Sequence, residues 1–79
     1  PMALKTIGRD ASCDVVLDSP LVSRQHARLE GNLLTDLGSA NGTFVEGQPI
    51  SEVYLKKGQR VTIGPYHLEF NGQDLRFLG

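Results

Sequence analysis

The sequence is short of several residue types, and each shortage excludes a class of protein. Its 79 residues contain one cysteine, Cys13, and no tryptophan. A single cysteine excludes an internal disulfide framework and a zinc site built from several cysteines, and it fits a reducing compartment. No apolar run approaches the roughly 18 residues that cross a membrane, and no signal peptide is visible. We therefore expect a cytoplasmic domain with no direct membrane contact, even if its parent protein is membrane-associated.

The chain also lacks an excess of charge of either sign. Eight basic residues against nine acidic ones give a formal net charge of −1. Such a chain has no general attraction for nucleic acid, so any anion site must come from a local cluster of basic groups. The length predicts one domain over residues 1–79, with a thin core. The opening Pro1-Met2 suggests that this domain was excised from a longer protein.

Long helical patterns are missing as well, because Gly and Pro interrupt the chain too often. Short strand-like runs recur instead, separated by turn residues such as Asn71-Gly72. Between them, "GQPI" and "KKGQ" are interpreted as turn segments. This pattern predicts an all-β fold, an antiparallel β-sandwich of about 9–11 short strands with binding loops at one end. The expected strands are Ala3–Ile7, Val15–Leu17, Gln25–Glu30, Asn32–Leu37, Thr43–Glu46, Arg60–Ile63, Tyr66–Phe70 and Asp74–Leu78.

Two polar clusters raise the question of catalysis. Ser23 or Ser39, with His26 and Asp36, supplies the residue types of a nucleophilic triad. However, the sequence has no G-x-S-x-G elbow, and Ser23 and His26 are separated by a loop-to-strand junction that defines no attack geometry. We therefore expect no catalytic residues.

Nucleotide and metal sites are also disfavoured. The segment "GSANGT" lacks the lysine of a phosphate-binding P-loop and precedes a strand rather than a helix. His26 and His67 lie far apart in the sequence and have no neighbouring ligands at metal-binding spacing. We expect no metal and no cofactor.

A compact anion site is the better interpretation of the polar clusters. Gly8-Arg9, Ser23-Arg24 and Ser39–Thr43 fall in three loops, and the loops at one end of a sandwich converge. Arg offers paired donors that suit phosphate, Ser offers a short hydroxyl, and Gly lets backbone N–H groups approach an oxygen closely. On a nearly neutral domain, this combination predicts capture of a single phosphate.

The order and spacing of five segments resemble those of the forkhead-associated (FHA) domain. These segments are "TIGR", "DVVL", "VSRQHARL", "TDLGSANGTFVEG" and "LKKGQRVTIG", and the similarity runs from Ile7 to about Phe70. The resemblance implies a β-sandwich without enzymatic activity that binds phosphothreonine peptides through loops at one end. The implied partner is a threonine-phosphorylated protein, the product of a Ser/Thr kinase, bound by a monomeric domain. The segment "TIGPYHLEFNG" is similar to FHA segments of larger bacterial proteins, including ABC-type transporters.

The resemblance assigns five residues to phosphopeptide binding. Arg9 would hold phosphate oxygens through its guanidinium, Ser23 would donate its hydroxyl, and Arg24 would add further donors. Asn41 would grip the peptide main chain, and Ala40 would offer its N–H. Three of them have a plainer alternative: Arg9 as a surface residue, Arg24 as an ion-pair partner of a carboxylate such as Asp10 or Asp36, and Asn41 as a turn residue.

Five further residues resemble the family's scaffold positions. His26 would brace the binding loop through hydrogen bonds, and Ser39 would shape its turn. Gly8 and Gly42 would serve backbone conformation, and Thr43 would start a strand.

Two features bear on specificity. Ala40 occupies a slot where some family members carry a hydroxyl that reaches the phosphothreonine, which leaves open an FHA-like domain that binds partners independently of phosphorylation. Leu21 and Val22 resemble positions that read residues beyond the phosphothreonine, and their side chains predict an apolar preference there.

Overall fold

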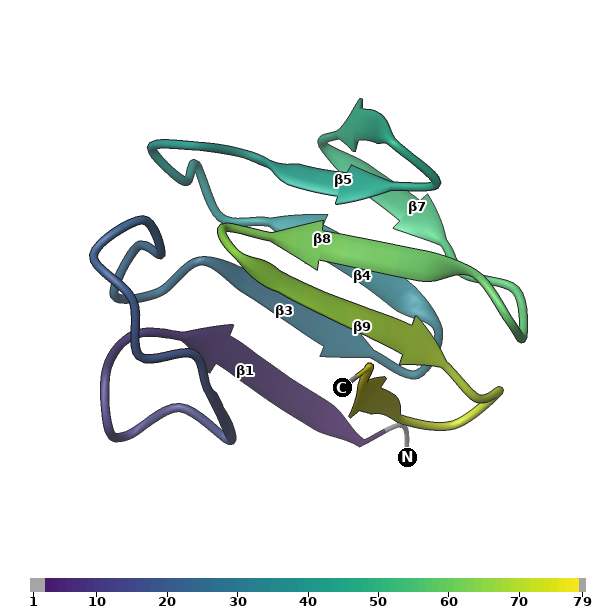
Figure 1. Cartoon of the computed structure of the whole chain (residues 1–79). Coiled ribbons are helices and arrows are strands. Elements are labelled where there is room, and N and C mark those ends of the chain that lie inside the picture. Colours follow the sequence, from purple (N-terminus) through teal and green to yellow (C-terminus); the bar gives the residue numbers. More distant parts are fainter. Residues whose placement is uncertain (1–2, 79) are drawn as a thin grey trace.

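The computed structural model describes residues 3–78, which form ten strands and no helix. The strands lie in two facing layers (Figure 1), one with the order β2-β1-β3-β4-β7 and the other β10-β9-β8-β5-β6. Neighbouring strands are antiparallel except β1 and β2, which are parallel. The predicted all-β sandwich of short strands is therefore confirmed. The strands are β1 (Leu4–Gly8), β2 (Val15–Val16), β3 (Ala27–Glu30), β4 (Leu33–Asp36), β5 (Thr43–Val45), β6 (Gln48–Ile50), β7 (Glu52–Tyr54), β8 (Arg60–Ile63), β9 (Tyr66–Phe70) and β10 (Leu75–Phe77).

Two strands were not predicted. β6 lies in the segment interpreted as a turn, and β7 follows it after Ser51. Both are three residues long and lie at sheet edges, β6 in one layer and β7 in the other. Pro49 is tolerated in β6 because an edge strand has one side on which a missing backbone N–H costs nothing.

The core lies between the layers and follows strand alternation. On β3, Ala27 and Leu29 are buried while Arg28 and Glu30 are exposed, as period-2 patterning predicts. His26 lies within the predicted strand Gln25–Glu30, but in the structure it precedes β3 and is fully buried. The core cluster comprises Ile7, Leu17, Val22, Ala27, Leu29, Leu34, Val45, Leu55, Val61, Ile63 and Phe70.

The two ends of the sandwich differ in character. The segments that follow β1, precede β3, join β4 to β5 and join β8 to β9 gather at one end, on the left in Figure 1. At the other end, Lys5 of β1 and Asp74 after β9 form an ion pair between the two layers. A cavity of about 660 Å³ opens there, floored by Leu29, Leu55 and Phe70. No helix within residues 3–78 is long and apolar enough to cross a membrane.

Candidate functional site

The end of β1 brings Arg9 beside the segment that carries Ser23 and Arg24. The backbone N–H of Arg9 donates to the carbonyl of Ser23 at 3.0 Å, and that of Asp10 donates to the carbonyl of Arg24 at 3.2 Å. This approach requires glycine at position 8, because a Cβ there would lie 2.1 Å from the carbonyl oxygen of Arg24. Arg9, Ser23 and Arg24 therefore share one rim of the molecule.

Both arginine side chains at this rim are exposed. Within residues 3–78, no hydrogen bond or ion pair holds either guanidinium. A hydrogen bond from the Ser12 hydroxyl lowers the pKa of Asp10, burial opposes it, and the backbone N–H groups of Ser12 and Ala11 and the charge of Arg24 lower the pKa further. Asp10 is thus ionised beside Arg24.

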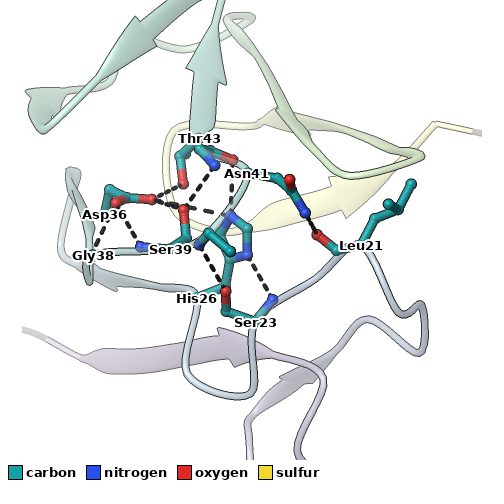
Figure 2. A network of polar contacts seen from close by, with 10 residues as sticks. Leu21, Ser23, His26, Asp36, Gly38, Ser39, Asn41 and Thr43 are labelled. Carbon is teal, nitrogen blue, oxygen red and sulfur yellow. Dashed lines mark hydrogen bonds and ion pairs between the residues drawn. The ribbon is translucent and has the colours of Figure 1, made fainter.

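The β4–β5 loop adds a third segment to the rim. The backbone N–H of Ala40 donates to the hydroxyl oxygen of Ser23 at 3.0 Å, and the Nδ2 group of Asn41 donates to the carbonyl of Leu21 at 2.8 Å. Figure 2 shows Asn41 turned toward Leu21. The three polar loops that the sequence separates are therefore joined to one another.

His26 supports this junction from beneath. Its Nδ1 accepts the backbone N–H of Ser23 at 3.0 Å, and its Nε2 donates to the carbonyl of Gly42 at 2.8 Å. These partners fit a neutral imidazole with its proton on Nε2. Both ring nitrogens thus bond to backbone groups, while the Ser23 hydroxyl bonds to Ala40. Ser23 and His26 do not form the nucleophile–base pair that a triad requires.

Asp36 is the centre of the polar network in Figure 2. Its Oδ1 accepts the hydroxyls of Ser39 at 2.6 Å and Thr43 at 2.7 Å, and its Oδ2 accepts the backbone N–H groups of Gly38 at 3.1 Å and Ser39 at 3.0 Å. The Ser39 hydroxyl in turn accepts the N–H of Gly42 at 2.9 Å. One carboxylate thereby fixes the shape of the whole β4–β5 loop.

Burial alone would raise the pKa of Asp36, but the hydrogen bonds from Ser39, Thr43 and Gly38 outweigh it and hold the pKa below the ordinary 3.8. Sequence reasoning missed this supporting role, since Asp36 was weighed only as a triad member or an ion-pair partner. The available signal was local: an Asp followed by Gly and Ser at the second and third positions favours a turn built on the Asp side chain.

The predicted scaffold residues occupy this network. Thr43 is the first residue of β5 and is fully buried, and Gly42 has a φ of 92°, a left-handed conformation that favours glycine. Ser39 bonds within the turn as described above. The contacts of Gly8, His26, Ser39, Gly42 and Thr43 are therefore with the protein itself.

One specificity prediction is wrong. Leu21 is 52% exposed beside Asn41, but Val22 is 1% exposed and belongs to the core. Val22 packs on the β8–β9 turn, where a Cβ at Gly64 would lie 3.0 Å from its Cγ2. Only Leu21 of the two can contact a peptide in this conformation.

A metal site has no support among the described residues, which contain no group of three or more candidate ligands. His26 is committed to the site loops, whereas His67 lies on β9 beside Thr62, with 3.3 Å between its Nδ1 and the threonine hydroxyl. The rim instead carries two exposed arginines and the hydroxyl of Ser23, which are donors that suit an oxyanion.

Comparison with known proteins places this geometry in a family. The sequence profile of the FHA domain matches residues 5–64. Glycogen accumulation regulator GarA of Mycobacterium tuberculosis is 42% identical over 72 residues, which cover 86% of this chain and 44% of GarA. The chain therefore spans less than half the length of that relative.

Two solved structures of Mycobacterium tuberculosis proteins are similar throughout the fold. EmbR in complex with a low-affinity phosphopeptide has a TM-score of 0.86 and 36% identity over 90% of this chain and 20% of EmbR. The FHA-2 domain of an ABC transporter has a TM-score of 0.87 and 36% identity over 100% of this chain and 77% of that one. The converging loops, the Arg and Ser at their rim, and these matches agree: the chain belongs to the FHA domain family.

Proposed function

We propose that this domain binds a phosphothreonine-containing segment of a partner protein at the rim formed by its three loops. The observation that carries the proposal is the backbone pairing of Arg9 with Ser23, which places a guanidinium-bearing residue and a hydroxyl-bearing residue side by side. In this proposal the Arg9 guanidinium and the Ser23 hydroxyl donate to the phosphate oxygens. Arg24 adds positive charge, offset in part by Asp10.

Asn41 and Ala40 have distinct roles in the proposal. One N–H of the Asn41 Nδ2 group is engaged with Leu21, so its Oδ1 is free to accept an N–H from the peptide main chain and its second N–H is free to donate to a peptide carbonyl. Ala40 contributes through its backbone, which holds the Ser23 hydroxyl in place. The exposed side chain of Leu21 then favours an apolar peptide residue beyond the phosphothreonine.

Comparison with EmbR supports the proposal, since that protein is 36% identical and was solved with a phosphopeptide. GarA, which is 42% identical, is named a regulator rather than an enzyme. We propose accordingly that this domain binds and does not catalyse, that its partner is phosphorylated by a Ser/Thr kinase, and that it acts as a monomer in the cytoplasm. The unpaired Cys13 agrees with a reducing compartment.

The magnitude of the phosphate contribution decides whether phosphorylation acts as a switch. A hydrogen bond to a charged group contributes about 1.5–3 kcal/mol. Two such bonds, from Arg9 and Ser23, separate phosphorylated from unmodified peptide by about 3–6 kcal/mol, a factor of roughly 10² or more in affinity.

The proposal is tested with a peptide library that holds phosphothreonine at a fixed position and a matched library with threonine. We expect the domain to retain the phosphorylated library selectively. Arg9→Ala should abolish that selectivity, while Arg60→Ala, which removes an exposed arginine from β8 in the other layer, should preserve it. Equal retention of both libraries would instead favour binding independent of phosphorylation, the alternative that the missing hydroxyl at Ala40 suggests.

A further inference from the structure

The segment from Leu17 to Gln25, here called the Ser23 loop, behaves as a compact unit. Its backbone bonds to itself, with Ser19 N–H to Leu17 carbonyl at 3.0 Å and Val22 N–H to Ser19 carbonyl at 3.0 Å. The N–H of Leu21 also donates to the Ser19 hydroxyl at 3.2 Å. These bonds link the start of the loop to Val22, the residue directly before Ser23.

Residues from three directions hold the Ser23 loop. On the β1 side, the N–H of Leu17 donates to the carbonyl of Gly8 at 2.8 Å. On the β4–β5 side, Asn41 bonds to Leu21. On the third side, the hydroxyl of Tyr66 donates to the carbonyl of Asp18 at 3.2 Å.

Tyr66 differs in its origin from these attachments and from the bonds that Arg9, Asp10, Ala40 and His26 make to the same loop. It is the first residue of β9 and follows the part of the chain, residues 5–64, that matches the FHA profile. Its ring packs partly against the core and meets the ring of Phe77 on β10 edge to face, with centroids 6.1 Å apart and an interplanar angle of 65°. Such edge contacts fix the direction of an aromatic ring. The β9–β10 hairpin therefore aims the Tyr66 hydroxyl at the Ser23 loop.

The Tyr66 attachment also differs in what happens on binding. Asn41 belongs to the proposed peptide contact, so its bond to Leu21 is open to rearrangement when a peptide binds. Tyr66 contacts the carbonyl of Asp18, a group that is not among the proposed phosphate or peptide contacts. It can hold the loop in the same position in the free and the bound states, and a preorganised loop loses less conformational entropy on binding.

We propose that Tyr66 is a positioning residue of the phosphopeptide site, which it serves by anchoring the Ser23 loop through its hydroxyl. This inference rests on the proposed function, because it concerns affinity for the same ligand. It assigns the C-terminal hairpin a part in recognition, although no residue of that hairpin lies among those proposed to touch the peptide.

The test compares Tyr66→Phe with Tyr54→Phe. The first variant keeps the ring and its contact with Phe77 and removes only the hydroxyl, while the second removes the hydroxyl of a 68% exposed tyrosine on edge strand β7. Peptide affinity is measured by calorimetry with one phosphothreonine peptide selected from the library, and stability is measured by urea unfolding. We expect Tyr66→Phe to weaken phosphopeptide binding by about two- to tenfold, the value of one hydrogen bond, and Tyr54→Phe to leave it unchanged.

A second measurement separates positioning from general support of the fold. Backbone amide resonances of residues 18–24, Pro20 excepted, in free Tyr66→Phe should show exchange broadening that wild type lacks, while those of β3 and β8 stay sharp. Unchanged affinity together with unchanged loop resonances overturns the inference, as does a loss of affinity that Tyr54→Phe shares. Wild-type domain that fails to distinguish phosphorylated from unmodified peptide overturns the proposed function instead, so the two failures are distinguishable.

Discussion

The backbone N–H of Ala40 donates to the hydroxyl oxygen of Ser23 at 3.0 Å, across two loops that are 17 residues apart in the sequence. Because an acceptor site of this oxygen is occupied, the hydroxyl is held in place with its own proton still available for donation. The relationship makes Ser23 both a ligand candidate and a link between loops.

Replacing Ser23 with alanine should therefore weaken phosphopeptide binding by about 10- to 100-fold, since a charge-assisted bond is lost together with the link to Ala40. Calorimetric titration of one phosphothreonine peptide measures the change. Ser51→Ala, at the exposed junction between β6 and β7, serves as the control and should bind as wild type does. If Ser23→Ala also binds as wild type does, the hydroxyl is not a phosphate ligand.

Ala40→Ser should strengthen phosphopeptide binding, because it places a hydroxyl at the exposed rim without disturbing the backbone N–H that holds Ser23. One added neutral hydrogen bond is worth about 1 kcal/mol, or roughly fivefold in affinity. Titration of the same peptide against Ala3→Ser, an exposed alanine at the other end of the sandwich, supplies the comparison. Unchanged affinity would show that the hydroxyl faces away from the ligand, and a weaker complex would show that it disturbs the link to Ser23.

Gly8→Ala should damage both folding and binding. The new Cβ would lie 2.1 Å from the Arg24 carbonyl oxygen and 3.1 Å from the sulfur of Cys13, so β1 and the Ser23 loop must separate. Loss of this fit should cost ~3 kcal/mol of unfolding free energy, as strain in packed positions does. Gly58→Ala, where no atom lies within 4 Å of the new Cβ and φ is 92°, should cost about 1 kcal/mol from backbone strain and leave peptide affinity unchanged. Urea unfolding and titration together check both statements.

Asp36→Ala should destabilise the domain by ~2–4 kcal/mol, because it removes the acceptor of several hydrogen bonds and leaves the hydroxyl of fully buried Thr43 without its partner. Asp18→Ala removes an exposed carboxylate that makes no side-chain hydrogen bond or ion pair within residues 3–78, and should change stability by less than about 0.5 kcal/mol. Equal unfolding curves for the two variants would contradict the claim that Asp36 stabilises the β4–β5 loop.

The contribution of the Asp36 carboxylate to stability should also depend on pH. The native pKa of Asp36 is below its ordinary 3.8, so its ionised form stabilises the fold fully above that value and the contribution disappears as the pH falls through the lower native pKa. Wild-type stability should therefore fall more steeply below about pH 4 than that of Asp36→Ala. Asp10 shifts in the same direction but is exposed, so Asp10→Ala should retain most of the wild-type pH dependence. Unfolding measured from pH 2 to 6 distinguishes them.

Most of the strands can be predicted from the sequence, and those that cannot be predicted have physical reasons for it. Strands such as β8 and β9 match their predicted bounds because Gly64-Pro65 separates two alternating runs. β6 and β7 were not predicted because each is only three residues long, which is too short to show a periodic pattern, and β6 also contains Pro49.

The site shows the same division. The motifs locate the loops. The sequence does not indicate which of the adjacent apolar residues Leu21 and Val22 is buried. In the structure, the turn at Ser19 directs Val22 into the core and leaves Leu21 exposed. The bond from Tyr66 to Asp18 joins residues 48 positions apart, so no local pattern announces it. Side-chain roles that depend on such distant partners can be assigned only from the structure.

Asp36 ends β4 in one layer and Thr43 begins β5 in the other, so their hydrogen bond fastens the two layers together. A loop grafted in place of residues 37–42 to recognise a larger ligand would have to preserve this hydrogen bond, because without it the two sheets are less firmly held together at this end. The β1–β2 connection joins strands of a single layer, and its bonds run to β1 and the Ser23 loop. Insertions meant to retarget the domain therefore belong in that connection, beyond the backbone bonds of Arg9 and Asp10.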